Sequence, residues 1–339
     1  DRGRQSAASN WGALYGVFLY FMLLTWLGFG QGWKAFFLLC AVLTLLGAAN
    51  NYKDLPADQG TAVQPSAPKM DWRALLASRV GGLLAVRTLM ALALLVLIFC
   101  VMMPDKFPRI SNIMNIFKQA SINCLIASGM LCALITAGID LSVGSNCVLC
   151  TCTIGVLVQN FGITSMPLLI IAGLAVSTFA GFVNGILLTR LDLPHPFVST
   201  MGMKNVLWGL ALVITGSKSI AFTNTGVDDL MWIGGGSIGK TETFPGIPFS
   251  FILVLIVFCI FHVFLTRSAL GRQIYCVGGN PEAARLSGIP SKNVLTFVYS
   301  LSGFMAGMAG VVSVGRLASA NGNAGSTYDN DAIAACIVG

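Results

Sequence analysis

Charge is scarce in this sequence: Asp, Glu, Lys and Arg make up 10% of its 339 residues, whereas 55% of the residues are hydrophobic. A soluble domain carries about 25% charged residues, so a chain with so little charge does not keep most of its surface in water. Histidine is rarer still, with two residues in the whole chain, which leaves little material for a histidine-based metal centre. These absences exclude an ordinary soluble protein.

Long polar interruptions are few as well. Apolar residues fall in blocks of about 17–23, long enough for a helix to cross about 30 Å of hydrocarbon. Backbone groups in lipid must be hydrogen-bonded within their own segment, which favours helices, and the alternating segments of a β-barrel are not seen. We therefore predict an all-α, polytopic transmembrane helical bundle with about nine to ten spans. The predicted spans are 11–30, 34–49, 86–103, 119–137, 142–159, 167–189, 198–216, 249–266 and 294–315, with a tenth starting near 331.

Ten cysteines are present, but they do not form a metal-binding pattern. Cys147, Cys150 and Cys152 have no matching second pair, and a zinc site needs four ligands that converge. Nine of the cysteines lie inside apolar blocks, where cysteine behaves as a small apolar residue. We predict reduced cysteines and no metal site.

The formal net charge of +7 does not indicate nucleic-acid binding, because Lys and Arg lie mainly in short loops between apolar blocks. Such loops face the cytoplasm in membrane proteins. The loop 267–293 holds four basic residues and the single acid Glu282, whereas acids outnumber bases in the loop 217–248. The first loop is therefore predicted to be cytoplasmic and the second to lie outside.

The loop 104–118 lies outside by this count, yet it carries Lys106, Arg109 and Lys118. Its apolar residues repeat at helical spacing, which predicts an interfacial helix on the outer surface. A miscounted span is the alternative. Further upstream, residues 1–50 are predicted to form an extra transmembrane hairpin, and residues 51–81, rich in Pro, Ala, Asp and Gln, a cytoplasmic linker. The main domain is then 82–339.

The cytoplasmic loop contains the segment Gly278-Gly279-Asn280-Pro281-Glu282, which has the features of a helix start. Asn280 can cap the helix, Pro281 suits the first helical position, and Glu282 complements the positive end of the helix dipole. Gly288 and Pro290 then end it. Two interpretations remain open: an ordinary connector helix, or a small knob that fits a groove in a soluble partner.

Polar residues inside the apolar blocks are the next candidates. Asp140 and Ser142 follow a predicted helix break, where Asp140 either caps the next helix or lines a transport route. Gly181 and Gly185 have the four-residue spacing that lets membrane helices approach closely, as have Gly303 and Gly307. Asn184 is the polar residue available there to face a water-filled route.

Residues 234–241 match the phosphate-loop pattern G-x4-G-K-T, but only formally. That loop needs a buried strand before it and a helix after it, whereas Pro245 interrupts the stretch after Thr241. The segment is also predicted to lie outside the cell, where ATP is scarce. We predict no ATPase site and no catalytic residues in this chain.

Four strings along the chain resemble one protein family. The stretch GGNPEAARLSGI at 278–289 contains EAA-x3-G, which resembles the coupling-loop motif of ABC importer permeases and looks like its ribose/galactose version. The stretches 115–145, 181–203 and 328–339 resemble the same family in the same order. The resemblance covers roughly residues 86–339.

This resemblance implies a permease subunit that passes a monosaccharide, of galactose or ribose type, across the bacterial inner membrane. The implied partners are a cytoplasmic ABC ATPase subunit that holds the ATP, a periplasmic sugar-binding protein and a second permease copy. The hairpin at 11–49 is extra relative to the family, which continues beyond Gly339, so the domain 82–339 is expected to be incomplete at its C-terminus. The implied ATPase-coupling loop comprises Gly278, Gly279, Asn280, Pro281, Glu282, Ala283, Ala284, Arg285, Ser287 and Gly288. The candidate translocation-pathway residues are Asp140, Ser142, Asn184 and Phe197.

The competing class is a self-contained secondary transporter or membrane enzyme. Secondary transporters bury ionisable residues at mid-membrane for ion coupling. The apolar blocks of this chain contain few charges, which favours the permease. Uptake that continues without any ATPase would distinguish the two.

Overall fold

A computed structural model of the chain describes residues 90 and 93–338 except for 192, 194, 223–224, 243 and 326. The predicted hairpin at 1–50 and linker at 51–81 lie outside the described residues. The chain divides into two compact units, one of residues 26–112 and one that contains residues 113–339. In the first unit, an apolar helix covers Ala93–Met102, and the rings of Phe99 and Phe107 lie 6.3 Å apart.

Six helices of the described residues are long and apolar enough to cross a membrane. The helical membrane fold is thus confirmed, while the predicted count of nine to ten spans is not. The six are α4 (Ile110–Ile135), α5 (Val143–Phe161), α6 (Met166–Arg190), α7 (Pro196–Thr215), α9 (Phe249–Arg267) and α12 (Ser291–Leu317). A further helix, α13 (Tyr328–Val338), covers the place where the tenth span was predicted to start.

The prediction of a separate interfacial helix in 104–118 is wrong. Residues from Ile110 onward form the first turns of α4, which runs without a break to Ile135. No proline interrupts this stretch after Pro108, so the helical spacing of its apolar residues continues directly into the span.

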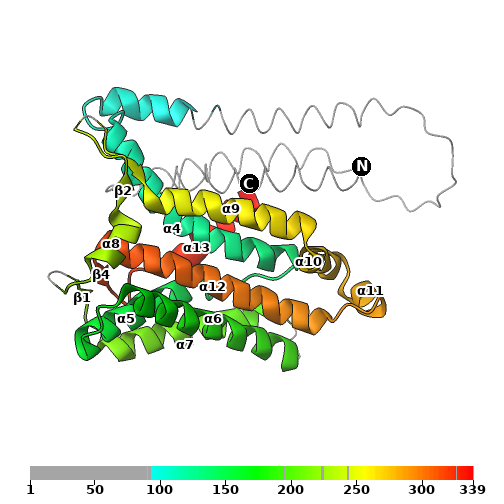
Figure 1. The fold of residues 1–339 in the computed structure, drawn as a ribbon. Helices are drawn as coiled ribbons and strands as arrows, with labels where there is room; N and C mark the ends of the chain where they lie inside the picture. The colour runs from blue at the N-terminus through cyan, green and yellow to red at the C-terminus, as the bar shows by residue number, and fades with distance from the viewer. Residues whose placement is uncertain are drawn as a thin grey trace, which may run out of the picture. The chain divides into compact units, whose positions relative to one another are not determined.

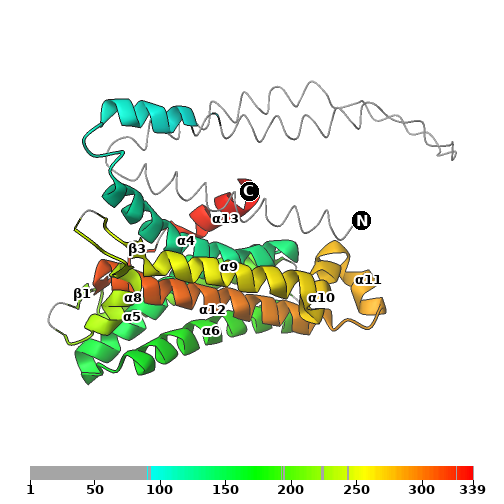
Figure 2. The ribbon, with the colours of Figure 1, turned by 45° about the horizontal axis from the view of Figure 1, so that its top comes forward.

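The connections between the spans gather at two ends (Figure 1). One end carries α10 (Ala269–Gly279) and α11 (Pro281–Leu286), which follow α9. The other carries α8 (Asp228–Gly235) and four short strands, in which β1 (Ile220–Ala221) pairs with β4 (Ser319–Ala320) and β2 (Ser237–Ile238) pairs with β3 (Ile247–Pro248). Figure 2 shows α9, α12 and α6 running side by side between these ends. The basic loop and the acidic loop therefore lie at opposite ends, as their charges predict.

Helix α12 forms the centre of the bundle and packs against α6, α5 and α8. Its contact with α6 is very close: a Cβ added to Gly181 would lie 2.5 Å from the backbone oxygen of Tyr299, and one added to Gly303 would lie 2.5 Å from that of Ser177. A side chain at either position would push the helices apart. The packing role predicted for these small residues is confirmed.

Residues 234–241 do not form a phosphate loop. They comprise the end of α8, strand β2 and the turn of the β2–β3 hairpin, where Gly239 has φ +71°. The element that follows Thr241 is the strand β3 rather than a helix, so the helix N-terminus that would bind phosphate is not formed. The match to the motif is formal, as predicted.

The described cysteines are free thiols, and those of α4 and α5 are buried among apolar side chains. Cys147, Cys150 and Cys152 all lie on α5 within this packing. The part of the chain that the structure describes holds no group of three metal-binding side chains.

Candidate functional site

The short helix α11 directly follows the helix α10, which is held firmly in the bundle. Ser268 caps α10 by accepting a hydrogen bond from the backbone N–H of Gly271 (2.8 Å). Helix α10 is amphipathic and buries Ile274 and Val277. At Gly278 its backbone meets the last turn of α4, where an added Cβ would overlap the backbone oxygen of Ile135. Glycine is required there because no side chain fits.

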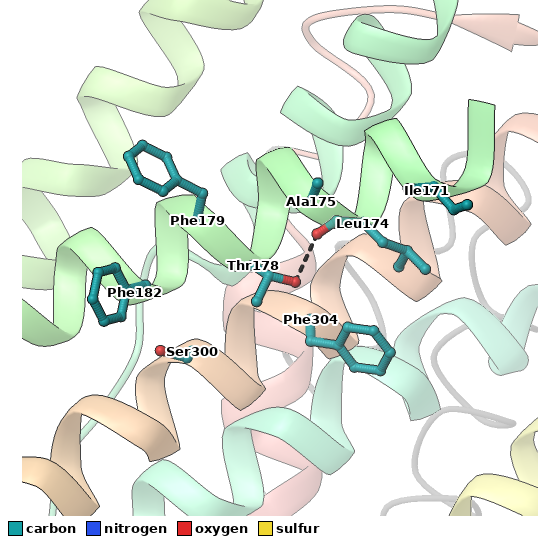
Figure 3. Close-up of a pocket in the computed structure, with 8 residues that line it drawn as sticks. All are labelled: Ile171, Leu174, Ala175, Thr178, Phe179, Phe182, Ser300 and Phe304. Atoms are coloured by element: carbon teal, nitrogen blue, oxygen red, sulfur yellow. Dashed lines mark hydrogen bonds between the residues drawn. The ribbon is translucent and has the colours of Figure 1, made fainter. Parts of the chain in front are cut away.

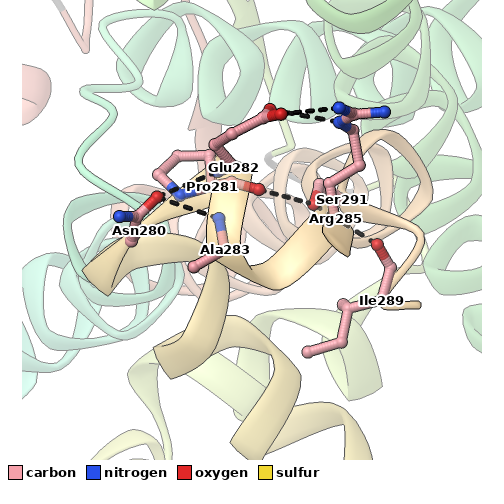
Figure 4. Close-up of polar contacts among 7 residues, drawn as sticks. All are labelled: Asn280, Pro281, Glu282, Ala283, Arg285, Ile289 and Ser291. Atoms are coloured by element: carbon pink, nitrogen blue, oxygen red, sulfur yellow. Dashed lines mark hydrogen bonds and ion pairs between the residues drawn. The ribbon is translucent and has the colours of Figure 1, made fainter. Parts of the chain in front are cut away.

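Helix α11 begins as the sequence predicts (Figure 4). The Oδ1 atom of Asn280 accepts hydrogen bonds from the backbone N–H groups of Glu282 (3.1 Å) and Ala283 (3.0 Å). Pro281 occupies the first turn, where its missing N–H costs nothing. Two of the N–H groups that a helix start leaves without partners are thereby satisfied.

The end of α11 is also defined by local bonds. The backbone N–H of Ile289 donates to the carbonyl of Ala284 (3.0 Å), and Gly288 adopts φ +82°, a left-handed conformation that glycine tolerates best. Ala284 is the residue of α11 that is buried, with 4% of its surface exposed. A helix held at both ends and by one small contact presents its remaining side chains to solvent.

The solvent-facing side of α11 combines an ion pair with an apolar residue. Arg285 donates to Glu282 through Nε–Oε2 (3.1 Å) and Nη2–Oε1 (2.5 Å). This hydrogen-bonded pairing lowers the pKa of Glu282 and raises that of Arg285, so both stay charged near neutral pH. Leu286 beside them is 76% exposed. Leu286 was not predicted as a site residue, although a leucine beside the charged pair in a six-residue helix was the available signal.

A second candidate site is a buried polar cluster around Asp140, in the connection between α4 and α5. The Oδ1 atom of Asp140 accepts hydrogen bonds from the N–H (3.0 Å) and the Oγ (2.6 Å) of Ser142, and its Oδ2 atom accepts from the Oγ of Ser302 on α12 (2.7 Å). Asn184 of α6 donates to Oδ1 (3.4 Å) and accepts from the Oγ of Ser199 on α7 (2.6 Å). Asp140 thus links the start of α5 directly to α6 and α12 and, through Asn184, to α7.

The structure brings together three of the four candidate pathway residues. Asp140, Ser142 and Asn184 are 0–2% exposed, whereas Phe197, at the start of α7, is 55% exposed and lies outside the cluster. The bond from the N–H of Ser142 to Asp140 closes a local turn just before α5 and does not reach the N–H groups of the first helical turn. The bonds to Asn184 and Ser302 tie this carboxylate to α6 and α12, and its place on a transport route stays a prediction.

An ion pair inside the bundle was not predicted from the sequence. Lys204 of α7 donates to the Oδ2 atom of Asp329 at the start of α13 (2.5 Å). The side chain of Lys204 is 26% exposed and that of Asp329 only 1%. The other carboxylate oxygen of Asp329, Oδ1, is buried without a hydrogen-bond partner. A lysine within the apolar block 198–216 was the available signal.

A groove of about 660 Å³ lies between α6 and α12 (Figure 3). Its polar groups are two hydroxyls, of which that of Thr178 donates to the carbonyl of Leu174 (2.6 Å) in its own helix. The groove is lined by Ile171, Leu174, Ala175, Thr178, Phe179, Phe182, Ser300 and Phe304. This lining carries no charged or amide side chain to bind sugar hydroxyls and suits apolar packing.

The chain was compared with known protein families and curated proteins. Residues 112–339 match the family model described as branched-chain amino acid transport system / permease component. The ribose import permease of Haemophilus influenzae is 34% identical over 255 residues, which is 75% of this chain and 76% of that protein. The ribose permease of Escherichia coli K12 is 37% identical with the same coverage, and its D-allose permease is 36% identical over 74% of each chain. No solved structure matches the chain.

Proposed function

Because the chain belongs to the family of ABC importer permeases that contains these monosaccharide carriers, we propose that it is the membrane subunit through which an ATP-driven importer passes a monosaccharide into the cytoplasm. The substrate class is a galactose-like or ribose-like sugar, and the proposed location is the cytoplasmic membrane of a bacterium. ATP is bound and hydrolysed by a separate subunit, so this chain needs no cofactor. A periplasmic sugar-binding protein and a second permease copy complete the proposed assembly.

One observation carries this proposal: α11 is an exposed, locally rigid helix at the basic end of the bundle. Its caps at Asn280 and Gly288 hold its shape without a partner, and Ala284 anchors it. Leu286 supplies an exposed apolar contact, while Glu282 and Arg285 supply a charged pair at the same surface. A small rigid knob of this kind suits a groove in a soluble ATPase subunit, which we propose as its partner.

The proposed transmission follows the chain from α11 into α12. Helix α12 begins at Ser291, directly after the loop that ends α11, and holds Asp140 through Ser302. A partner shifts a conformational equilibrium only through contacts that differ between the two states. Movement of α11 by the ATPase would change the position of α12 and, through it, the cluster at Asp140.

We place Asp140, Ser142, Asn184 and Phe197 on the proposed sugar route. The carboxylate, hydroxyl and amide of the first three are the group types that bind sugar hydroxyls. They are buried in this conformation, so the route is closed at this point and the sugar would meet them in another state of the cycle. Phe197 is exposed at the start of α7.

The test is complex formation with the proposed ABC ATPase subunit of the same importer. We expect Leu286→Asp to weaken co-purification of the ATPase by about tenfold or more, because a central apolar contact would become a buried charge. Thr241→Asp, at the opposite end, is the matched control and should keep the complex intact. Normal ATPase binding by the Leu286 variant would remove the main support for the proposal.

The ion pair between Lys204 and Asp329 favours a second candidate, an ion-coupled secondary transporter. Ionisable groups buried in membrane spans often serve ion coupling. The spans therefore hold a largely buried ion pair, although the sequence indicated spans with few charges. Sugar uptake that persists in cells lacking every candidate ATPase, and that collapses with the proton gradient, would support this second candidate.

A further inference from the structure

Helix α7 exposes two different flanks, one on each side of the stripe that it buries. At 100° per residue, Phe197, Met201, Lys204, Asn205 and Trp208 share one flank, which we call the polar flank. The opposite flank, which we call the apolar flank, contains Val206, Leu210 and Val213, with exposures of 62%, 45% and 77%. Polar and aromatic groups are thus separated from purely aliphatic ones on a single spanning helix.

The composition of the polar flank argues against contact with lipid tails. Lys204 is charged and paired with Asp329, and Asn205 is an exposed amide that donates to the carbonyl of Met201 (3.1 Å). Charged and amide groups are costly in hydrocarbon and normally face protein or a water-filled cavity. The apolar flank has no such groups and suits lipid.

The chain next to this flank is irregular at the depth of the spans. Residues 321–327 connect β4 to α13 and are not helical where they are described. Gly322 lies against Leu212 of α7, and its carbonyl accepts a hydrogen bond from Nε1 of Trp208 (3.1 Å). Gly325 lies against Val148 of α5. Irregular backbone at membrane depth is tolerated where it is packed in protein or lines a cavity, as at the substrate sites of many transporters.

We propose that the polar flank of α7, together with Asp329, forms a monosaccharide-binding station on the transport route. The inference rests on the proposed importer function and adds where the sugar is held. Lys204 and Asn205 supply hydrogen-bond donors from this flank. The Oδ1 atom of Asp329 is buried without a partner near Gly144 of α5 in this conformation, and it becomes the acceptor for a sugar hydroxyl when the transport cycle opens the site. Trp208 is 43% exposed with its N–H already bonded, so its ring is free to pack against the apolar C–H face of the sugar.

Solvent access to the two flanks is the first test. In a Cys259→Ser/Cys276→Ser background, which removes two exposed native thiols, single variants Met201→Cys, Asn205→Cys, Val206→Cys and Val213→Cys are made in the full importer. We expect a water-soluble thiol reagent to modify the polar-flank pair at least about tenfold faster than the apolar-flank pair. A panel of ribose, allose, galactose and fructose should contain a sugar that slows the modification. Equal labelling of both pairs, or faster labelling of the apolar flank, would overturn the proposal.

The second test separates sugar binding from a merely structural ion pair. Asp329→Asn and Trp208→Leu are expected to lower uptake by roughly tenfold while the ATPase still co-purifies. The exchange Lys204→Asp/Asp329→Lys keeps an ion pair but reverses the groups that face the sugar, so uptake should stay low. Full uptake by the exchanged variant would show that the pair only holds helices together. If the unmodified importer takes up sugar without its ATPase, the proposed function fails, yet the labelling result still decides this proposal.

Discussion

At the scale of single residues, the fold depends on glycines at close helix–helix contacts and on one asparagine that caps a helix. Gly181 and Gly303 let α6 and α12 touch through their backbones, and Gly278 does the same for α10 and α4. The side chain of Asn280 accepts hydrogen bonds from backbone N–H groups in the first turn of α11, which have no acceptor within the helix. Each of these roles can be tested by changing one side chain.

Replacement of Gly181 by alanine should destabilise the protein. The new methyl group would lie 2.5 Å from the backbone oxygen of Tyr299, and relief of such overpacking costs about 1–3 kcal/mol. Thermal unfolding of the purified protein in detergent is the measurement. Gly202→Ala on α7 is the control, since nothing lies within 4 Å of its added Cβ. Equal melting temperatures for the two variants would contradict the close contact.

Loss of the Asn280 cap should weaken α11. In Asn280→Ala the N–H groups of Glu282 and Ala283 lose their acceptor, which costs about 1 kcal/mol of helix stability. The affinity for the ATPase subunit, measured by titration in detergent, should fall severalfold. Asn280→Asp retains an acceptor oxygen and should behave like the parent protein. A comparable loss in both variants would point to direct contact by Asn280 instead.

At the scale of elements, α11 and the Asp140 cluster illustrate two kinds of order. Helix α11 is defined by bonds within a few residues, so its start, its cap and its end were all predicted from sequence. The cluster joins residues from four separate elements, and its partners Ser199 and Ser302 could not be deduced from spacing. A helix held by bonds between near neighbours can be predicted from its sequence, whereas a cluster of residues far apart in the chain becomes visible only in the folded structure.

The ion pair of α11 predicts a pH response. Because Arg285 lowers the pKa of Glu282, the pair's contribution is complete above the ordinary glutamate pKa of about 4.3 and is lost only as pH falls through the lowered value. Arg285→Gln should return the Glu282 pKa towards its ordinary value. Carbon-13 NMR of labelled glutamate carboxyls, with Glu282→Gln for assignment, measures the change. An unchanged titration in the Arg285 variant would show that the pair does not persist in solution.

Asp140→Asn should be clearly destabilising. The carboxylate accepts hydrogen bonds from Ser142, Asn184 and Ser302, and an amide would replace one acceptor with a donor facing other donors. Leaving such buried groups without partners costs about 1–3 kcal/mol. Thermal unfolding in detergent measures the effect, with Thr178→Ala, whose hydroxyl bonds only within its own helix, as the control. Equal stability of the two variants would exclude a tightly bonded cluster.

At the scale of the whole molecule, the alternation of spans fixes which loops share a side. Cys276 on α10 is exposed at the end that carries α11, and Thr241 is exposed at the other end. With Cys259 replaced by serine, a membrane-impermeant thiol reagent applied from outside should label Thr241→Cys and spare Cys276. Inside-out vesicles should reverse the pattern. Labelling of Cys276 from outside would invert the orientation on which the proposed ATPase contact depends.

Most of the bundle could be predicted because its main signal is the length of each apolar run. The bounds of α5, α6, α7, α9 and α12 lie within a few residues of the predicted spans. The errors arose where one pattern fits two structures: helical spacing in 104–118 was compatible with a surface helix and with the start of α4. The pair of Lys204 and Asp329 was missed because its members are 125 residues apart, and no local pattern joins them.

The contact of Gly278 with Ile135 has a mechanical consequence. Helices α10 and α11 form one short arm whose base bears on the tip of α4 and whose far end continues into α12. A force applied to this arm would therefore act on α4 and α12 together. These two helices also touch further along, where a Cβ on Gly129 of α4 would lie 2.9 Å from the Cα of Ser302 on α12. Because the arm, α4 and α12 contact one another in this way, they should rotate together as a rigid body, and the individual helices should bend little.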